Sequence, residues 1–165
     1  MANNPKSTAA IGGHPLHPML IPFPIAFLVA AFACDLVFWG NRNVFWAEAS
    51  IWLIGAGVVM ALVAALAGFT DFFGEERIRA LNAAWFHMIG NLSAVVTAIG
   101  NFALRYFQGS DAAILPWGIV LSFITVGTLL FTGWMGWEMG YRHQVGIIDR
   151  GAGAEIVSER PRRVA

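Results

Sequence analysis

Four histidines are the residues of this sequence whose types and spacing best suit ligand binding; they are His14, His17, His87 and His143. Two of them, His14 and His17, are three residues apart in the segment Gly-Gly-His-Pro-Leu-His-Pro. At the start of a helix, residues at this spacing share a face, so both side chains can converge on one ion or cofactor. His87, with Asp71 or Glu138 nearby, completes a donor set suited to zinc, iron or copper. We therefore predict a transition-metal site built from these histidines and carboxylates.

The same residues also fit two other interpretations. His17 and His87 could be the two axial ligands of a b-type haem lodged between helices, with His14 and His143 as alternates. Alternatively, histidines and carboxylates at a membrane interface cap helix ends, pair with arginines and hydrogen-bond free carbonyls, which needs no ligand. None of the spacings is a strong metal motif such as paired Cys-x-x-Cys, so the three interpretations stay open.

Two further carboxylates each have an arginine as the expected partner in an ion pair. Asp35 is the one carboxylate well inside a charge-poor segment, and an intramembrane carboxylate requires a partner. Arg105, just past a later segment of this kind, is the expected partner in a structural ion pair that closes the helix bundle, with a proton relay as the rival role. Glu138 and Arg142 are four residues apart, a spacing that suits an ion pair on one helix face.

The composition places the chain in a membrane. Of its 165 residues, 58% are hydrophobic and only 12% are charged, about half the charge of an ordinary soluble domain. Ten Lys and Arg balance ten Asp and Glu, so no bulk charge attracts nucleic acid. A single cysteine excludes an intramolecular disulfide and a thiolate cluster. The sequence contains neither a nucleophile–base pair nor a phosphate-binding loop, so we do not expect an enzyme.

Stretches without charged residues predict four membrane spans, at about residues 17–40, 49–71, 80–104 and 113–138. Each is long enough, at 1.5 Å per residue, to cross a hydrocarbon core of about 30 Å. Short connections make neighbouring helices antiparallel, so we predict an all-α integral membrane four-helix bundle over residues 14–148. Pro22 and Pro24 remove amide donors inside the first span and predict a kink in that helix.

Four crossings leave both termini on one side of the membrane. That side receives eight of the ten basic residues, namely Lys6, Arg77, Arg79, Arg142, Arg150, Arg160, Arg162 and Arg163, and the other side receives Arg42 and Arg105. Because cytoplasmic segments carry the excess of Lys and Arg, both termini are predicted to be cytoplasmic. We expect residues 1–13 to form a flexible tail, and residues 149–165, which are small and polar, to form a disordered one.

Several motifs, in order along the chain, resemble a bacterial membrane protein family. They are GGHPLHPMLIPFPIAF from Gly12, a later Cys-Asp-Leu, Gly-Phe-Thr-Asp ending at Asp71, His87 with Asn91, and GWEMGYRHQVG ending at Gly146. Together they resemble the four-span proteins of domain-of-unknown-function family 2231 over about residues 12–147. The HPLHP opening and the YRH-x-VG close are the specific parts. The resemblance implies a multi-pass protein of the bacterial inner membrane, with the motif residues as candidates without assigned roles.

These observations favour a protein that binds a transition metal or haem for electron transfer or as an accessory part of a redox complex. His17 and His87 would be the ligands, and Asp71 and Glu138 would orient them. The alternative is a structural or interaction subunit whose polar residues only tie helix ends together, and the third interpretation is a small transporter or channel formed by an oligomer. The expected partners are the lipid bilayer and either other membrane redox subunits or further copies of the chain.

Overall fold

A computed structural model describes residues 4–147, and residues 1–3 and 148–165, which include the predicted C-terminal tail, lie outside the described part. The helices are α1 (Leu16–Leu20), α2 (Pro22–Asn41), α3 (Val44–Gly74), α4 (Glu76–Arg79), α5 (Asn82–Gln108) and α6 (Ile119–Trp137). The π-helical turns η1 (Ile114–Gly118) and η2 (Glu138–Arg142) flank α6, and a small hairpin of β1 (Ala10–Ile11) and β2 (His14–Pro15) precedes α1. The predicted all-α class is confirmed.

Four helical segments are long and apolar enough to cross a membrane, at residues 16–41, 44–74, 82–108 and 114–142. They confirm the four predicted spans; the first two extend beyond the predicted bounds at both ends, and the last two begin slightly later and end later than predicted. The 31 residues of α3 measure about 46 Å at 1.5 Å per residue, more than a hydrocarbon core of roughly 30 Å. The charge-free stretch therefore indicates the part of a helix that can lie in lipid, whereas the hydrogen-bonded helix itself is longer than this part.

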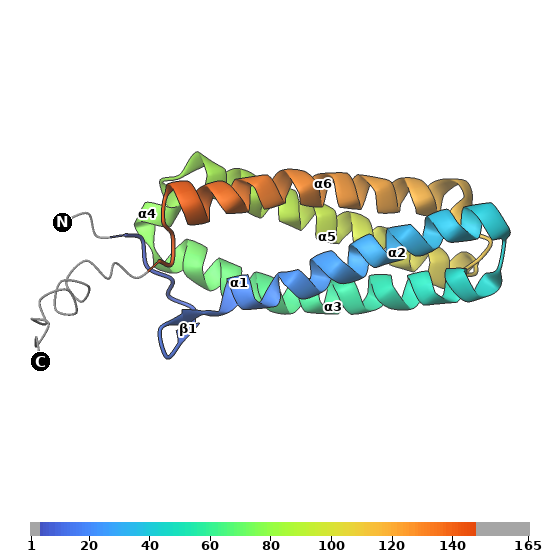
Figure 1. Ribbon diagram of the computed structural model, residues 1–165, viewed down its shortest axis with the longest axis horizontal. Coiled ribbons are helices and arrows are strands. Elements are labelled where there is room, and N and C mark those ends of the chain that lie inside the picture. Colours follow the sequence, from blue (N-terminus) through green and yellow to red (C-terminus); the bar gives the residue numbers. More distant parts are fainter. Residues whose placement is uncertain (1–3, 148–165) are drawn as a thin grey trace, which may run out of the picture.

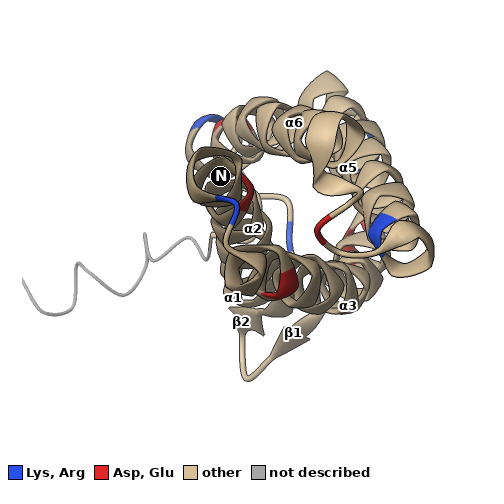
Figure 2. Ribbon diagram, turned by 90° about the vertical axis from the view of Figure 1, so that its right-hand side faces the viewer, with Lys and Arg blue, Asp and Glu red and all other residues tan. Residues whose placement is uncertain are grey.

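The spans form two antiparallel hairpins packed side by side (Figure 1). α1 and α2 run to the far end of the bundle and α3 returns; α5 and α6 then repeat this path, so α2 and α5 are parallel. Both described ends of the chain lie at one end of the bundle, called here the terminal end. Seen along its length, the bundle consists almost entirely of uncharged residues (Figure 2).

Small side chains allow the helices to approach closely. Alanines dominate the buried apolar positions, among them Ala31, Ala47, Ala94 and Ala98. Large apolar side chains such as Trp52, Leu130 and Phe107 are instead exposed on the outside of the bundle. This is the reverse of a soluble core and is the arrangement that helix packing in lipid requires, because lipid tails are as apolar as the side chains that face them.

The first span is interrupted at Ile21, directly before Pro22. Ile21 keeps helical backbone angles (φ −60°, ψ −27°), and its N–H donates to the carbonyl of His17 at 3.1 Å. Pro22 takes the first position of α2, where its fixed backbone angle is compatible with a helix. The prolines thus produce a one-residue break in an otherwise helical path, which supports the predicted kink in part.

The N-terminal segment is attached to the terminal end by hydrogen bonds. The Asp71 carboxylate, near the end of α3, accepts from the Ser7 hydroxyl at 2.8 and 3.0 Å and from the Ala9 N–H at 2.7 Å. The Gly146 N–H donates to the Pro5 carbonyl at 2.9 Å. This part of the expected flexible tail therefore makes specific contacts with two segments of the terminal end, the last turns of α3 and the residues after η2.

Candidate functional site

Two of the four histidines meet inside the bundle near its terminal end. His17 lies on α1 and His87 on the second turn of α5. Their ring centroids are 5.9 Å apart and the ring planes are nearly perpendicular, at 82°. Both side chains are half-buried. The fold thus brings together the two residues that the sequence suggests as axial haem ligands, from opposite hairpins.

Each of these imidazoles is held by a main-chain carbonyl of the neighbouring helix. Nδ1 of His17 lies 2.9 Å from the carbonyl oxygen of Ala64 on α3, and Nδ1 of His87 lies 2.8 Å from that of Thr132 on α6. A carbonyl oxygen can only accept, so Nδ1 carries the hydrogen in both rings. In a neutral ring the lone pair is then on Nε2, which has no hydrogen-bond partner among residues 4–147.

This tautomer is the one that metal-binding histidines adopt. A ligating imidazole usually donates its other N–H to a carbonyl or carboxylate, which fixes the ring and leaves its lone pair for the metal. His17 and His87 each meet this condition without any contribution from a carboxylate. The two Nε2 atoms are therefore the available donors of the site.

Glycines provide the space for both rings. A Cβ atom added at Gly68 would lie 2.9 Å from Nδ1 of His17, and one added at Gly136 would lie 3.1 Å from Cε1 of His87. Both distances are shorter than ordinary van der Waals contact. A side chain at either glycine would therefore push the imidazole away from its carbonyl partner.

One further residue supports His87. The Thr132 hydroxyl donates to Oδ1 of Asn91 at 2.9 Å, and Asn91 is one turn after His87 on α5. Thr132 thus joins α5 to α6 through its side chain while its carbonyl accepts from His87. Sequence reasoning placed Asn91 among the family motifs without a role, and this contact gives it one.

The remaining predicted donors lie elsewhere or are bound to other groups. His14 is exposed on β2, where Nδ1 lies 3.1 Å from the Gly12 carbonyl, and His143 follows η2. Asp71 binds the N-terminal segment, and Glu138 pairs with Arg142 at 3.0 Å. Among residues 4–147 there is no group of three or more His, Cys, Asp or Glu that could hold a metal ion. The expected convergence of His14, Asp71 and Glu138 on the His17–His87 pair is therefore not found.

A second polar site lies towards the opposite end of the bundle. The Arg105 guanidinium donates to both oxygens of Asp35, each at 2.7 Å, and neither side chain has any exposed surface. The structure thus pairs Asp35 with the arginine named from the sequence. Arg105 is not past the end of its span, however, but inside α5, because the aspartate and its neighbours stabilise the buried charge.

Two serines and an asparagine complete this ion pair. Ser50 and Ser122 each donate to one Asp35 oxygen at 2.6 Å, and Nε of Arg105 donates to Oδ1 of Asn101 at 2.9 Å. Every fully buried side-chain nitrogen and oxygen of the described residues has a partner. Sequence reasoning gave Ser50 no role, although a lone polar residue in an apolar span is the signal that identifies such a partner.

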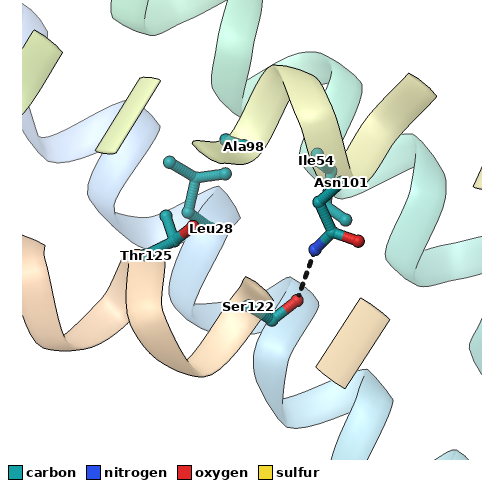
Figure 3. Close-up of a pocket in the computed structure, with 6 residues that line it drawn as sticks. All are labelled: Leu28, Ile54, Ala98, Asn101, Ser122 and Thr125. Atoms are coloured by element: carbon teal, nitrogen blue, oxygen red, sulfur yellow. Dashed lines mark hydrogen bonds between the residues drawn. The ribbon is translucent and has the colours of Figure 1, made fainter. Parts of the chain in front are cut away.

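The space between the two polar sites is small. A cavity of about 10 Å³ is lined by Leu28, Ile54, Ala98, Asn101, Ser122 and Thr125 (Figure 3). Inside it, Nδ2 of Asn101 donates to the Ser122 hydroxyl at 2.9 Å. This volume is close to the minimum that holds one water molecule. The ion pair therefore has no buried side-chain polar atom without a partner among the described residues, whereas Nε2 of His17 and of His87 has none.

Comparison with known proteins gives one match. The family model described as "Predicted membrane protein (DUF2231)" matches residues 13–149, which is most of the chain. No curated protein and no solved structure matches. The matched region contains both the histidine pair and the buried ion pair.

Proposed function

The chain belongs to the DUF2231 family of predicted membrane proteins, and we propose that it binds a transition-metal ion inside the membrane through His17 and His87. The observation that carries this proposal is the meeting of two imidazoles from opposite hairpins, each with its Nδ1–H donated to a carbonyl and its Nε2 without a partner. Imidazole nitrogen is a ligand for iron, copper, zinc and nickel.

The spacing of the rings fits one ion between them. Two metal–nitrogen bonds of about 2.0–2.1 Å place the centroids of the two imidazoles roughly 6 Å apart. The observed separation is 5.9 Å. Two protein ligands suit an ion whose other ligands come from a second molecule, such as a haem, or an ion of low coordination number, such as reduced copper.

Both candidate ions change oxidation state by one electron, so the proposed role is electron transfer or an accessory function in a membrane redox complex. The proposed location is the bacterial inner membrane, with the terminal end and its histidine pair on the cytoplasmic side. Other redox subunits or further copies of the chain would be its partners.

The test is an absorption spectrum and an elemental analysis of the full chain purified in detergent from cells supplied with iron, copper and a haem precursor. We expect one equivalent of metal per chain, lost in His17→Ala and in His87→Ala. His14→Ala, which removes an exposed histidine outside the pair, is the matched control and should keep the metal. Purified protein with neither a Soret band nor stoichiometric metal would overturn the proposal.

A structural subunit is the second candidate, and the fully hydrogen-bonded ion pair of Asp35 and Arg105 favours it. In that case the histidines serve only to join helices through the carbonyls of Ala64 and Thr132. His17→Ala and His87→Ala would then lower the melting temperature without removing any bound species. The same purified variants distinguish the two functions.

A further inference from the structure

The two hairpins repeat the same pattern of buried residues. Four of the buried positions of α2 are Pro24, Leu28, Ala31 and Asp35, and four of those of α5 are Ala94, Ala98, Asn101 and Arg105. Each residue of the second set comes 70 residues after its counterpart in the first, the separation found for the Asp35–Arg105 pair. His17 and His87 have this separation as well.

The second helices of the hairpins match in the same way. The residues Ser50, Ile54, Gly57 and Ala64 are buried on α3, and Gly118, Ser122, Thr125 and Thr132 are buried on η1 and α6. The separation between counterparts in this set is constant and two residues shorter than the 70 residues between counterparts on the first helices. The hydrogen bonds show this difference, since His17 and Ala64 are 47 residues apart and His87 and Thr132 are 45 apart. A second contact joins equivalent positions with donor and acceptor exchanged: Ser50 of α3 donates to the Ala31 carbonyl of α2, whereas Asn101 of α5 donates to the Gly118 carbonyl of η1.

These equivalences relate the hairpins by an approximate two-fold axis along the bundle. The parallel courses of α2 and α5, and of α3 and α6, have the same symmetry (Figure 1). Asp35 and Arg105 occupy equivalent positions and contact each other, which happens only next to such an axis. His17 and His87 also occupy equivalent positions and meet, so the histidine site lies on the axis too.

Each hairpin therefore carries the same half of the site. It consists of a histidine on the first helix, a carbonyl on the second helix that accepts from Nδ1, and a glycine four residues after that carbonyl. In one half these are His17, Ala64 and Gly68. In the other half they are His87, Thr132 and Gly136.

We infer that the site takes an iron porphyrin, with one axial imidazole supplied by each hairpin; this inference rests on the proposed metal-binding function. A ligand on a two-fold axis must present equivalent faces to the two halves, and the two axial positions of a haem iron do so. The porphyrin supplies four nitrogens, so two histidines complete six-coordination. Zinc, by contrast, takes three or four protein ligands, and residues 4–147 hold no group of three.

The test uses haem titration of the purified full chain, followed by absorption and electron paramagnetic resonance spectroscopy. Wild type is expected to give a six-coordinate low-spin haem at one per chain. His17→Ala and His87→Ala should each give a five-coordinate high-spin haem or lose it, and to a similar extent, because the half-sites are equivalent.

Glycine variants test the half-sites without removing a ligand. Gly68→Ala and Gly136→Ala place a methyl group against His17 and His87 respectively, so both should lower the low-spin fraction at least several-fold. Gly133→Ala, on α6 one turn before Gly136, meets no atom within 4 Å and should leave the spectrum unchanged. Circular dichroism of each variant checks that the helices still form.

Each other outcome overturns the inference. Stoichiometric copper without haem, lost in His17→Ala, would exclude the porphyrin and leave the proposed function standing. A five-coordinate haem that responds to only one histidine would exclude the two equivalent half-sites. Absence of any metal would exclude the proposed function together with this inference.

Discussion

At the scale of single residues, Asp35 and Arg105 place two opposite charges in a fully buried environment. Both charges are removed from water, and their mutual hydrogen bonds, those donated by Ser50 and Ser122 to Asp35 and the one that Arg105 donates to Asn101 compensate for the lost hydration. Such a pair stabilises little relative to apolar residues of equal size, but removal of one partner leaves an uncompensated charge.

We therefore predict opposite outcomes for single and double substitution of this pair. Asp35→Ala should lower the free energy of unfolding by about 3–5 kcal/mol, and the double variant Asp35→Leu/Arg105→Met should recover most of this loss. Unfolding in mixed detergent micelles, followed by circular dichroism, measures both. Arg142→Ala removes an exposed ion pair and should cost about 1 kcal/mol or less. A double variant less stable than Asp35→Ala would contradict the argument.

Glu75, in the connection between the second and third spans, gives a prediction about pH. Hydrogen bonds from the Arg77 side chain, at 2.9 and 3.0 Å, are the main cause that lowers the pKa of Glu75 from 4.5 to about 2. Because the folded pKa lies below the ordinary value, the interaction is fully present above pH 4.5 and is lost as the pH falls towards 2.

The measurement is an NMR titration of the Glu75 side-chain carboxyl carbon in detergent. Its midpoint should lie near pH 2 in the wild type and move up towards 4.5 in Arg77→Ala. Glu76→Gln, which changes the neighbouring and highly exposed carboxylate, should leave the midpoint of Glu75 in place. A wild-type midpoint near 4.5 would show that the bond to Arg77 does not persist in solution.

The histidine site shows how far single residues could be interpreted from sequence. Residue type and spacing identified His17 and His87 as candidates, because imidazole nitrogen is a common ligand of transition metals and haem iron. The same reasoning added Asp71 and Glu138, whose carboxylates are in fact bound by Ser7 and Arg142. A local sequence pattern does not reveal which side chain donates a hydrogen bond to a carboxylate, particularly when the donor is 64 residues away, as Ser7 is from Asp71.

At the scale of elements, charge and hydropathy located the spans, but the contacts of the N-terminal segment depend on the complete fold. Its polar composition is equally compatible with a free tail. What orders residues 5–9 is the Asp71 carboxylate, which accepts from the segment at three sites, the hydroxyls of Ser7 and Thr8 and the N–H of Ala9.

We therefore expect Asp71→Ala to release this segment while the bundle stays folded. A spin label at Ser7 would report the loss of the partner directly but would remove the hydroxyl, so the label belongs at Lys6. The mobility of this label should rise clearly in Asp71→Ala. It should stay unchanged in Glu138→Gln, because the Glu138 carboxylate at the terminal end pairs with Arg142 and does not bind the segment. Equal mobility in the wild type and in Asp71→Ala would show that the segment is free in solution.

At the scale of the whole molecule, the buried ion pair changes the count of basic residues that sets orientation. Arg105 lies inside the bundle and is neutralised by Asp35, so it does not contribute a charge to the opposite end. Of the described basic residues, Lys6, Arg77, Arg79 and Arg142 belong to the terminal end, and Arg42 alone remains at the other. Among the described residues the asymmetry is therefore four against one, stronger than the four against two that would hold if Arg105 counted at the opposite end.

This asymmetry predicts that the terminal end faces the cytoplasm, since Lys and Arg flanking the spans are retained there during insertion. A reporter fused after Ala165 should be active only if it is of the cytoplasmic type, and one inserted at Arg42 only if it is of the periplasmic type. Replacing Arg77 and Arg79 by Gln while adding two lysines beside Arg42 should produce a mixed or inverted population, whereas Arg105→Gln should leave the orientation unchanged. Periplasmic activity of the wild-type Ala165 fusion would reverse the assignment and move the histidine pair to the outer face, where its redox partners would have to be sought.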